Sequence, residues 1–394
     1  MIVRSVSNTG PPRSSEAGEN NHRLAAGTFA PERLLVYNLD SLGIGDLGLN
    51  NMADLHERYS RQVLFDPIGR SGQERLSQSS AVIIGCGALG SIQAEILARA
   101  GVGRLRLVDR DFVEESNLHR QLMFEEADAN DRLPKSVAAG RRINRINSSV
   151  KVEPLVADVS CENVEDLVRG SDIILDGTDN FETRFLINDA AIKMGIPWIY
   201  GAAVGSYGLT MTIMPGSGPC LSCVLEAMPE PGSGPTCDTA GVIAPIVALI
   251  GSIQSAEALK ILVGDVERLH RSLIRVDVWD FRFDRLDMSG RMSSVGCAAC
   301  GGDYEHLRGT SRQTATALCG RNAVQVSRPG GGKIDFGQLA RRLEPLGQVS
   351  FNEYVLRFHV DGYDITVFQD ARSIIRGTGD MTIARNLYAR YIGA

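Results

Sequence analysis

The sequence predicts an α/β fold with a doubly wound, mainly parallel sheet, followed by a small α+β module. Three observations support this prediction. Short runs rich in β-branched residues alternate with helical patterns from Ser79 onward, which is typical of a parallel sheet with helices on both faces. A glycine-rich turn joins the first of these runs to a helix. The composition, 43% hydrophobic and 22% charged residues, is that of an ordinary soluble domain.

The strands expected in the main sheet are residues 81–85, 105–109, 152–157, 172–176 and 198–200, with a further strand at 273–279. A long apolar segment, 240–264, precedes this last strand. It contains Pro245, Gln254, Glu257 and Lys260, so it lacks the roughly 20 uncharged apolar residues that a membrane span needs. We therefore expect a buried helix there and no membrane association. The Gly/Pro-rich residues 228–235 predict a surface loop.

Sequence patterns divide the chain into three parts. Residues 1–53 are rich in Ser, Asn, Gly and Pro without a sustained period, which predicts a disordered or weakly ordered tail. Residues 54–305 carry the alternating pattern and form the main domain. Residues 316–394 predict a separate module of unknown role, with strands at 323–326, 354–360 and 364–368 and helices at 335–343 and 381–391.

Length, charge and cysteine usage exclude several classes of protein. A chain of 394 residues can form two or three domains with full hydrophobic cores, which excludes a disulfide-stapled miniprotein. The formal net charge of -6 argues against nucleic acid as a partner. We expect no secretory signal, because the first residues lack an apolar segment of the required length. Four of the eight cysteines form two C-x-x-C pairs, which favours a metal site in the reducing cytoplasm.

The glycine-rich turn has the sequence Gly85-Cys86-Gly87-Ala88-Leu89-Gly90, and Asp109 ends the next strand 19 residues after Gly90. This is a Rossmann-like nucleotide-binding pattern. Glycines allow a tight turn and close approach of phosphates, the helix N-terminus offers N–H donors, and the acid can hold a ribose hydroxyl. A purely structural turn, an NAD site and an ATP site all remain open on this motif alone.

Further motifs surround this turn in a fixed order: Arg58-Tyr59-Ser60-Arg61-Gln62, Asp109-Arg110-Asp111, Ser116-Asn117-Leu118-His119-Arg120-Gln121, Pro134-Lys135 and Asp176-Gly177-Thr178-Asp179-Asn180. With them the chain resembles the ThiF/MoeB/HesA family, bacterial relatives of ubiquitin-activating enzymes, over roughly residues 55–301. The resemblance implies an adenylation domain that binds ATP and activates the C-terminal glycine of a small ubiquitin-fold sulfur carrier as an acyl-adenylate. It also implies a homodimer.

The resemblance assigns roles to individual residues. Gly85, Gly87, Ala88 and Gly90 would form the phosphate loop, Asp109 would bind the ribose, and Asn117, Arg120 and Lys135 would bind phosphates. Asp179, beside Asn180 in the nucleotide site, would hold Mg²⁺, and Arg61 would reach the phosphates from the partner subunit. Asp111 and Arg184 would play supporting roles. Ala88 departs from the family, which usually has a third closely spaced glycine there; a methyl group is tolerable if the backbone at position 88 is helical.

Each of these residues also has a structural alternative. Arg61 and Arg120 could form surface ion pairs, Lys135 could be a solvated residue in the first turn of a helix, and Asp179 could cap the helix that begins near Phe181. The ordered set around a phosphate loop favours the functional interpretation over these alternatives.

The two C-x-x-C pairs are Cys220 with Cys223 and Cys297 with Cys300. Each pair can place two thiolates on one tetrahedral ion, and the resemblance places the same pairs around the same segment. A site with four cysteines and no open position should hold structural Zn²⁺. Disulfides or a redox pair are the alternative.

Cys237 stands at the end of the predicted loop and just before the long helix. A thiol near a helix N-terminus can have a lowered pKa, which favours the reactive thiolate. The resemblance implies that this cysteine forms a covalent intermediate in some family members. A passive loop cysteine is the alternative.

The chain is therefore predicted to be an adenylyltransferase that uses ATP with Mg²⁺ and carries a structural Zn²⁺ ion. The sulfur would come from a cysteine desulfurase or a similar donor. The residues around Cys237 are most similar to the thiazole-biosynthesis branch of the family, and activation of the molybdopterin-synthase small subunit is the alternative. Two alternatives belong to other classes of protein: an NAD-dependent oxidoreductase and a catalytically silent binding module of the same fold.

Overall fold

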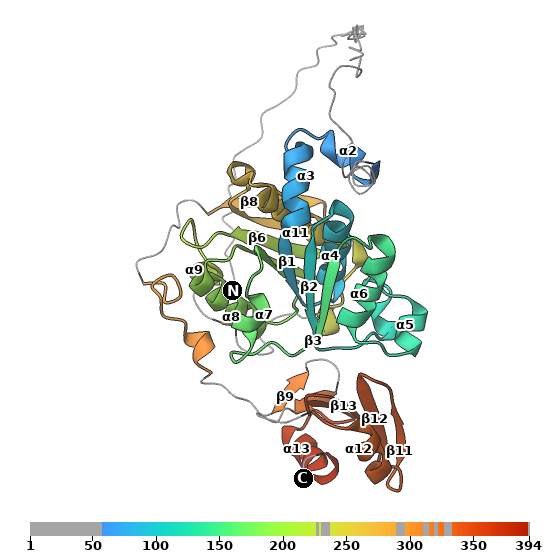
Figure 1. The fold of residues 1–394 in the computed structure, drawn as a ribbon. Coiled ribbons are helices and arrows are strands. Elements are labelled where there is room, and N and C mark those ends of the chain that lie inside the picture. The colour runs from blue at the N-terminus through green and yellow to red at the C-terminus, as the bar shows by residue number, and fades with distance from the viewer. Residues whose placement is uncertain are drawn as a thin grey trace, which may run out of the picture. The chain divides into compact units, whose positions relative to one another are not determined.

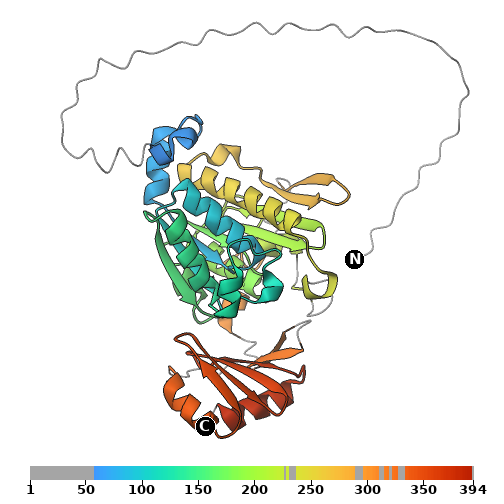
Figure 2. The same ribbon diagram turned by 90° about the vertical axis from the view of Figure 1, so that its right-hand side faces the viewer.

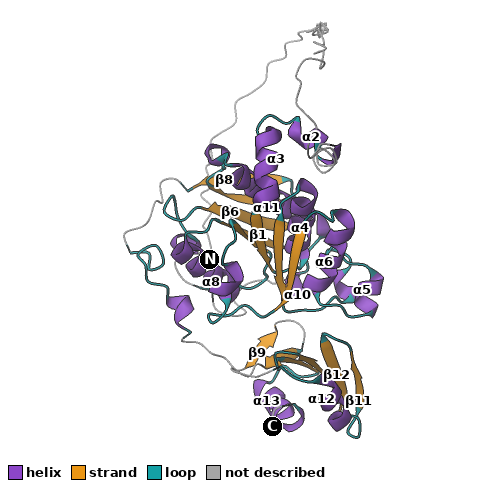
Figure 3. Ribbon diagram, viewed as in Figure 1, coloured by secondary structure: helices purple, strands orange, loops and turns teal. Residues whose placement is uncertain are grey.

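The computed structural model describes residues 57–225, 228–229, 237–288, 296–309, 315–318, 322–326 and 333–392. The tail expected at residues 1–53 and most of the loop expected at 228–235 lie outside this part of the chain. Figures 1 and 3 show the elements of the described part, which contain two β-sheets with helices packed against them.

The first sheet has eight strands in the order β3-β2-β1-β4-β5-β6-β7-β8. Strands β3, β2, β1, β4 and β5 are parallel, and β6 to β8 are antiparallel. The mainly parallel α/β sheet predicted from the sequence is thus confirmed. The strands β6 and β8 were not expected. The bounds are β1 Ser80–Ile84, β2 Arg104–Asp109, β3 Lys151–Val156, β4 Ile173–Asp176, β5 Trp198–Val204, β6 Tyr207–Ile213, β7 Ser272–Asp277 and β8 Arg282–Asp287.

Helices cover both faces of this sheet, because the buried parallel strands are apolar on both sides (Figure 1). One face packs against α3 Gly69–Gln78, α4 Ala88–Ala100, α6 Lys135–Ile146 and α11 Ala244–Val263. The other packs against α7 Val164–Val168, α8 Phe181–Met194 and α9 Leu221–Leu225. The remaining short elements are α2 Ser60–Val63, η1 Glu115–Asn117, α5 Glu126–Asn130, α10 Cys237–Ala240, η2 Val266–Arg268 and η4 Glu305–Arg308.

The helix α11 is long and apolar enough to cross a membrane by length and composition alone. In the structure it packs against α4, β5 and β6 as part of the core (Figure 2). Its polar side chains are paired inside the domain: Gln254 Nε2 donates to the carbonyl of Ile199 over 3.1 Å, and Glu257 Oε2 accepts a hydrogen bond from the Thr212 hydroxyl over 3.0 Å. The buried helix expected at 240–264 is therefore confirmed.

The second sheet is antiparallel, with the strand order β11-β12-β13-β14-β10-β9. Its inner face packs on α12 Phe336–Leu343 and α13 Met381–Tyr391, which confirms a small α+β module near the C-terminus. We call this sheet with its two helices the C-terminal module. The strands β9, β11 and β14 were not expected. The bounds are β9 Ala315–Leu318, β10 Ala323–Val326, β11 Gln348–Phe351, β12 Val355–Val360, β13 Tyr363–Phe368 and β14 Ser373–Arg376.

Candidate active site and cysteine cluster

The glycine-rich turn joins β1 to α4 and packs against the end of β4. Gly85 has φ +87°, and a Cβ there would lie 2.6 Å from the carbonyl oxygen of Gly177. A Cβ on Gly90 would lie 1.8 Å from the carbonyl oxygen of Gly85. Ala88 is the first residue of α4, with Gly87 at the N-cap, so its methyl group is tolerated as expected. No side chain caps α4, which leaves its first N–H groups to bind an anion.

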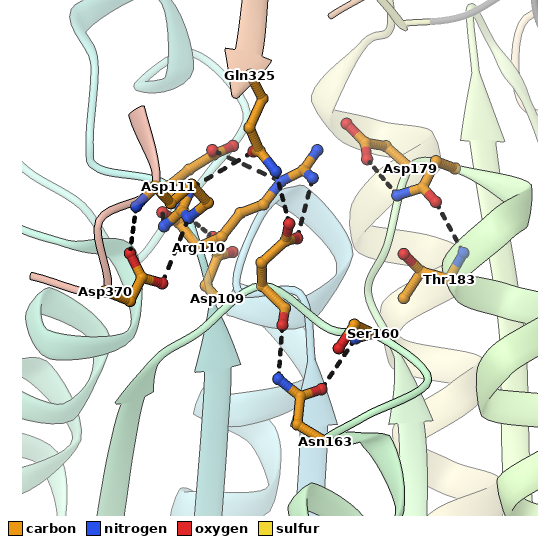
Figure 4. Close-up of polar contacts among 12 residues, drawn as sticks. Asp109, Arg110, Asp111, Ser160, Asn163, Asp179, Thr183, Gln325 and Asp370 are labelled. Carbon is orange, nitrogen blue, oxygen red and sulfur yellow. Dashed lines mark hydrogen bonds and ion pairs between the residues drawn. The ribbon is translucent and has the colours of Figure 1, made fainter. Parts of the chain in front are cut away.

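Asp109 ends β2, beside Arg110 and Asp111 (Figure 4), and its carboxylate fixes the glycine turn. Its Oδ2 accepts a hydrogen bond from the backbone N–H of Cys86, and its Oδ1 accepts one from the N–H of Asp111, both over 2.7 Å. Burial raises the pKa of this carboxyl group, while the nearby Lys135 ammonium opposes the rise. Each carboxylate oxygen can accept a second hydrogen bond, so a ribose hydroxyl can still bind here.

Lys135 is the first residue of α6, yet its side chain is only 6% exposed. Its ammonium lies 3.3 Å from Asp111 Oδ2. The alternative of a solvated lysine is therefore wrong, because this cation is buried beside Asp109 and Asp111. The Asp111 carboxylate is thus the ion-pair partner of this ammonium.

Asn117 and Arg120 lie on the segment that follows β2. Asn117 is 2% exposed, and its Oδ1 accepts a hydrogen bond from the N–H of Glu114 over 3.2 Å. Arg120 is half-buried, and its Nη1 donates to the carbonyl of Ser116 over 3.0 Å. Among the described residues Arg120 has no carboxylate partner, so the structure does not support the surface-ion-pair alternative for this residue.

Asp179 and Asn180 have different roles at the start of α8 (Figure 4). The Asn180 side chain caps the helix, with its Oδ1 accepting from the N–H of Thr183 over 2.9 Å. The alternative of Asp179 as this cap is therefore wrong. Asp179 is exposed three residues after the end of β4, which leaves its carboxylate accessible to a cation.

Arg184 lies behind this segment and supports it. Its Nε donates to Asp176 Oδ2 over 3.0 Å, and its Nη2 donates to the carbonyls of Thr178 over 2.7 Å and Gly201 over 2.9 Å. The side chain is buried, so it fixes the end of β4 rather than contacting a ligand.

Arg61 lies on α2 and is exposed, with no ion pair to another described residue. Its neighbours Leu64 and Phe65 are 70% and 60% exposed. The structure thus does not bring Arg61 into the group of residues around Asp109.

The sequence analysis named Arg110 within a motif but gave it no role, and it missed Asp158. Arg110 Nη1 lies 3.0 Å from Asp158 Oδ1, at the ends of β2 and β3 (Figure 4). The carboxyl ends of parallel strands meet at one edge of a sheet, so polar residues just after the strand at 152–157 were the available signal.

The four cysteines of the two C-x-x-C pairs form one cluster. The Sγ atom of Cys220 lies 3.7 Å from those of Cys223 and Cys297, and the Sγ atoms of Cys223 and Cys300 are 3.6 Å apart. All four lie within 4.8 Å of one another. Four sulfurs at about 2.3 Å from a central ion would lie about 3.8 Å apart, so the cluster can hold a tetrahedral metal ion. These separations exceed the roughly 2 Å of a disulfide bond, which argues against that alternative.

Asn188 on α8 orients the first pair of this cluster. Its Oδ1 accepts a hydrogen bond from the N–H of Leu221 over 2.9 Å, and its Nδ2 lies 3.7 Å from Cys220 Sγ. Such outer contacts hold metal-binding side chains in place.

Cys237 is the first residue of α10, a single turn that precedes α11. Its side chain lies outside the part that the structure describes, so its predicted reactivity stays a prediction. Cys86, within the glycine turn, is fully buried, and this burial raises its pKa well above the ordinary value. Cys86 is therefore a packing residue.

Comparison with known proteins shows which family and which relatives this chain resembles. A model described as the ThiF family matches residues 59–299. The sulfur carrier protein ThiS adenylyltransferase of Bacillus subtilis (strain 168) is 45% identical over 339 residues, which cover 85% of this chain and 99% of that protein. The sulfur carrier protein adenylyltransferase of Thermus thermophilus is 37% identical over 250 residues, covering 62% of this chain and 90% of that protein. A crystal structure of E. coli MccB with MccA-N7isoASN shares the fold, with a TM-score of 0.55, 22% identity, and coverage of 62% of this chain and 75% of that one.

Proposed function

The chain belongs to the ThiF family, and from this premise we propose that it is an ATP-dependent adenylyltransferase that activates the C-terminal glycine carboxylate of a small ubiquitin-fold sulfur carrier protein. The observation that carries the proposal is the edge of the main sheet. There the glycine turn follows β1, the buried Asp109 ends β2 with the buried Lys135 of α6 beside it, and the exposed Asp179 follows the adjacent strand β4. The similarity to the Bacillus and Thermus sulfur carrier adenylyltransferases supports the same activity.

In the proposed reaction the carrier carboxylate attacks the α-phosphorus of ATP. The bond to the bridging oxygen breaks, pyrophosphate leaves, and the carrier becomes an acyl-adenylate. Both reactants are anions, so catalysis needs cations and oriented N–H donors at the phosphates. Lys135 and Arg120 supply positive charge, and the N-terminus of α4 supplies N–H groups.

Mg²⁺ fits the carboxylate of Asp179, because the exposed oxygens of this side chain are the ligands that this ion prefers. When bound, the ion neutralises charge on the phosphates. Asp109 then binds the ribose, and Asn117 orients the phosphates beside Arg120.

For the cysteine cluster we propose structural Zn²⁺ bound by Cys220, Cys223, Cys297 and Cys300. The sulfur separations and the all-thiolate ligand set support this ion. The site would tie α9 to the segment after β8 and take no part in the reaction.

The carrier of thiazole biosynthesis is the preferred substrate, supported by 45% identity to a ThiS adenylyltransferase over nearly all of that protein. Activation of the molybdopterin-synthase small subunit is the rival outcome. An exposed apolar hairpin offers a protein-binding surface for the carrier: Trp279, Phe281 and Phe283 are 80%, 83% and 57% exposed on and beside the edge strand β8.

The proposal includes a cytoplasmic homodimer that receives sulfur from a cysteine desulfurase or a similar donor. Arg61 supports the dimer, since this exposed cation lies beside two exposed apolar side chains, Leu64 and Phe65, which a second subunit could cover.

The Cys237 thiolate would attack the acyl carbon of the adenylate, forming a thioester and releasing AMP, or attack the carrier sulfur of an acyl disulfide between carrier and sulfur donor, forming a new acyl disulfide and releasing the donor thiol. Adenylation itself needs no thiol, so Cys237→Ser should keep carrier-dependent pyrophosphate exchange within a few fold. The wild type, incubated with carrier, ATP and a sulfur donor, should form a covalent protein–carrier adduct that the variant lacks. An identical adduct in the serine variant would exclude Cys237 as the attachment point.

Exchange of labelled pyrophosphate into ATP tests the whole proposal. Exchange should require a carrier that ends in Gly-Gly, and a carrier without its last glycine is the matched control. NAD should not replace ATP. No exchange with either the thiazole or the molybdopterin carrier would refute the activity, and exchange with the second carrier alone would reassign the branch.

A further inference from the structure

The C-terminal module packs directly on the segment that follows Asp109. Phe112, three residues after Asp109, is buried in one apolar cluster with Val355, Phe368 and Ile374 of the module, and each of these side chains is at most 5% exposed. Arg376 of β14 also forms an ion pair with Glu114. The outer face of the second sheet therefore has the nucleotide edge of the first sheet as its packing partner.

Arg372 is the central polar group of this contact. It is 2% exposed, its guanidinium carbon lies 3.7 Å from the centre of the Phe368 ring, and its Nη2 donates to the carbonyl of Arg110 over 2.8 Å. Burying an arginine costs free energy unless its guanidinium is hydrogen-bonded. This charge-assisted bond therefore holds the Arg110 carbonyl firmly in position.

The carbonyl of Arg110 belongs to the same peptide group as the N–H of Asp111. That N–H donates to Asp109 Oδ1, and Asp109 Oδ2 accepts from the N–H of Cys86 in the glycine turn, both over 2.7 Å. A continuous series of hydrogen bonds thus runs from Arg372 through one peptide group and one carboxylate to the phosphate loop. Bonds in such a series polarise and strengthen one another.

A second bridge runs in parallel through side chains (Figure 4). Gln325 of β10 donates from Nε2 to Asp158 Oδ2 over 2.6 Å, and Asp158 Oδ1 lies 3.0 Å from Arg110 Nη1. Both the backbone and the side chain of Arg110 are therefore held by the C-terminal module.

We propose that the C-terminal module is part of the ATP site, and that Arg372 is a positioning residue that orients the ribose-binding carboxylate of Asp109 through the Arg110–Asp111 peptide. Docking of the module and binding of ATP favour each other. The inference rests on the proposed use of ATP. It assigns to the C-terminal module, whose role was unknown, a contribution to ATP affinity.

Arg372→Met tests the positioning role. We expect the Kd and the KM for ATP to rise about tenfold, since binding coupled through one contact commonly changes by that order. The KM for the carrier and kcat at saturating ATP should stay near wild type, because Arg372 touches neither reactant. Arg372→Lys should recover part of the affinity, since it keeps a cationic donor with fewer N–H groups.

Arg342→Met is the matched control. Arg342 also holds backbone carbonyls, with its Nη2 donating to Tyr391 over 2.8 Å, but this contact lies within the C-terminal module. Its ATP affinity should match that of the wild type. Equal losses of affinity in Arg342→Met and Arg372→Met would reduce Arg372 to a merely structural role and overturn the proposal.

Hydrogen exchange of the wild-type protein gives a test that needs no variant. Since coupling is reciprocal, a non-hydrolysable ATP analogue should slow exchange of amides in β10 and β14. Unchanged exchange there on saturation with the analogue, or an unchanged Kd in folded Arg372→Met, would overturn the inference. Both measurements report binding without catalysis, so they remain decisive if pyrophosphate exchange fails and the proposed activity falls.

Discussion

At the scale of single residues, the neighbours Asp179 and Asn180 were both candidates for the N-cap of α8. Either side chain can cap a helix, and the sequence analysis considered the first. The structure gives the cap to Asn180 and leaves Asp179 exposed. A carboxylate that is not needed for local structure, placed just after a sheet strand, is available for Mg²⁺.

Asp179→Ala should therefore leave folding intact and lower carrier-dependent pyrophosphate exchange by about 10²-fold or more, as expected when a preorganised charge is removed from a transition state. Arg120→Ala should have an effect of similar size. Glu182→Ala is the control, because this exposed acid lies on the first turn of the same helix. Near-wild-type exchange in Asp179→Ala, or an equal loss in Glu182→Ala, would contradict the assignment.

At the scale of elements, the turn from β1 to α4 shows why glycines with similar sequence context differ in importance. A Cβ at Gly90 would lie 1.8 Å from a backbone oxygen, whereas a Cβ at Gly87 would have its nearest neighbour, the end of the Gln121 side chain, at 3.7 Å. The first contact cannot be relieved without moving the turn, and the second is an ordinary one.

Gly90→Ala should thus lower the free energy of unfolding by about 2 kcal/mol or more, as overpacking commonly does. Gly87→Ala should leave it nearly unchanged. Urea denaturation of both variants measures the difference. Equal stability of the two would mean that α4 can shift away from β1, which would contradict the tight packing of this turn.

The cysteine cluster is the second element with a testable consequence. Metal analysis should find about one zinc ion per chain, and Cys300→Ser should lose the ion and unfold at a lower temperature, because metal binding contributes to folding. Cys161→Ser is the control, since Cys161 lies outside the cluster. A stable protein with no metal, or equal loss of zinc in both variants, would count against the site.

Two of the strands that the sequence analysis missed, β8 and β14, lack a long apolar or alternating run. Strand β8 has exposed or half-exposed residues throughout, so its pairing with β7 leaves no alternation of apolar and polar residues in Arg282–Asp287. Strand β14 has only four residues. The parallel strands were predictable because burial on both faces makes them continuous apolar runs. The edge strand β8 is defined by its backbone hydrogen bonds to β7, whereas β14 is a short internal strand between β13 and β10.

At the scale of the whole molecule, motifs predicted the main sheet and its nucleotide edge, but not the contact of Arg372 with Arg110. These two residues are 262 positions apart. Each is unremarkable in its own segment, and only the packing of two sheets brings them together. The glycine turn, Asp109 and Asp179 lie at the ends of the neighbouring strands β1, β2 and β4, so local patterns were enough to place them.

The proposed site needs Arg61 from a second subunit, so whether Arg61 acts across the dimer interface is a question about the whole molecule. Arg61→Ala and Asp179→Ala should each be inactive as homodimers. In a mixed dimer of the two variants, one site combines an intact Asp179 with the partner's intact Arg61, and the other site lacks both. Coexpression at equal levels should give mixed dimers for about half of the population by random pairing, with one active site in two, so exchange should return to about a quarter of wild type. The Arg61→Ala protein paired with Arg61→Ala/Asp179→Ala is the control and should stay inactive. If the Arg61→Ala and Asp179→Ala mixture shows no recovery while mixed dimers are detected by mass spectrometry, Arg61 does not act across the interface.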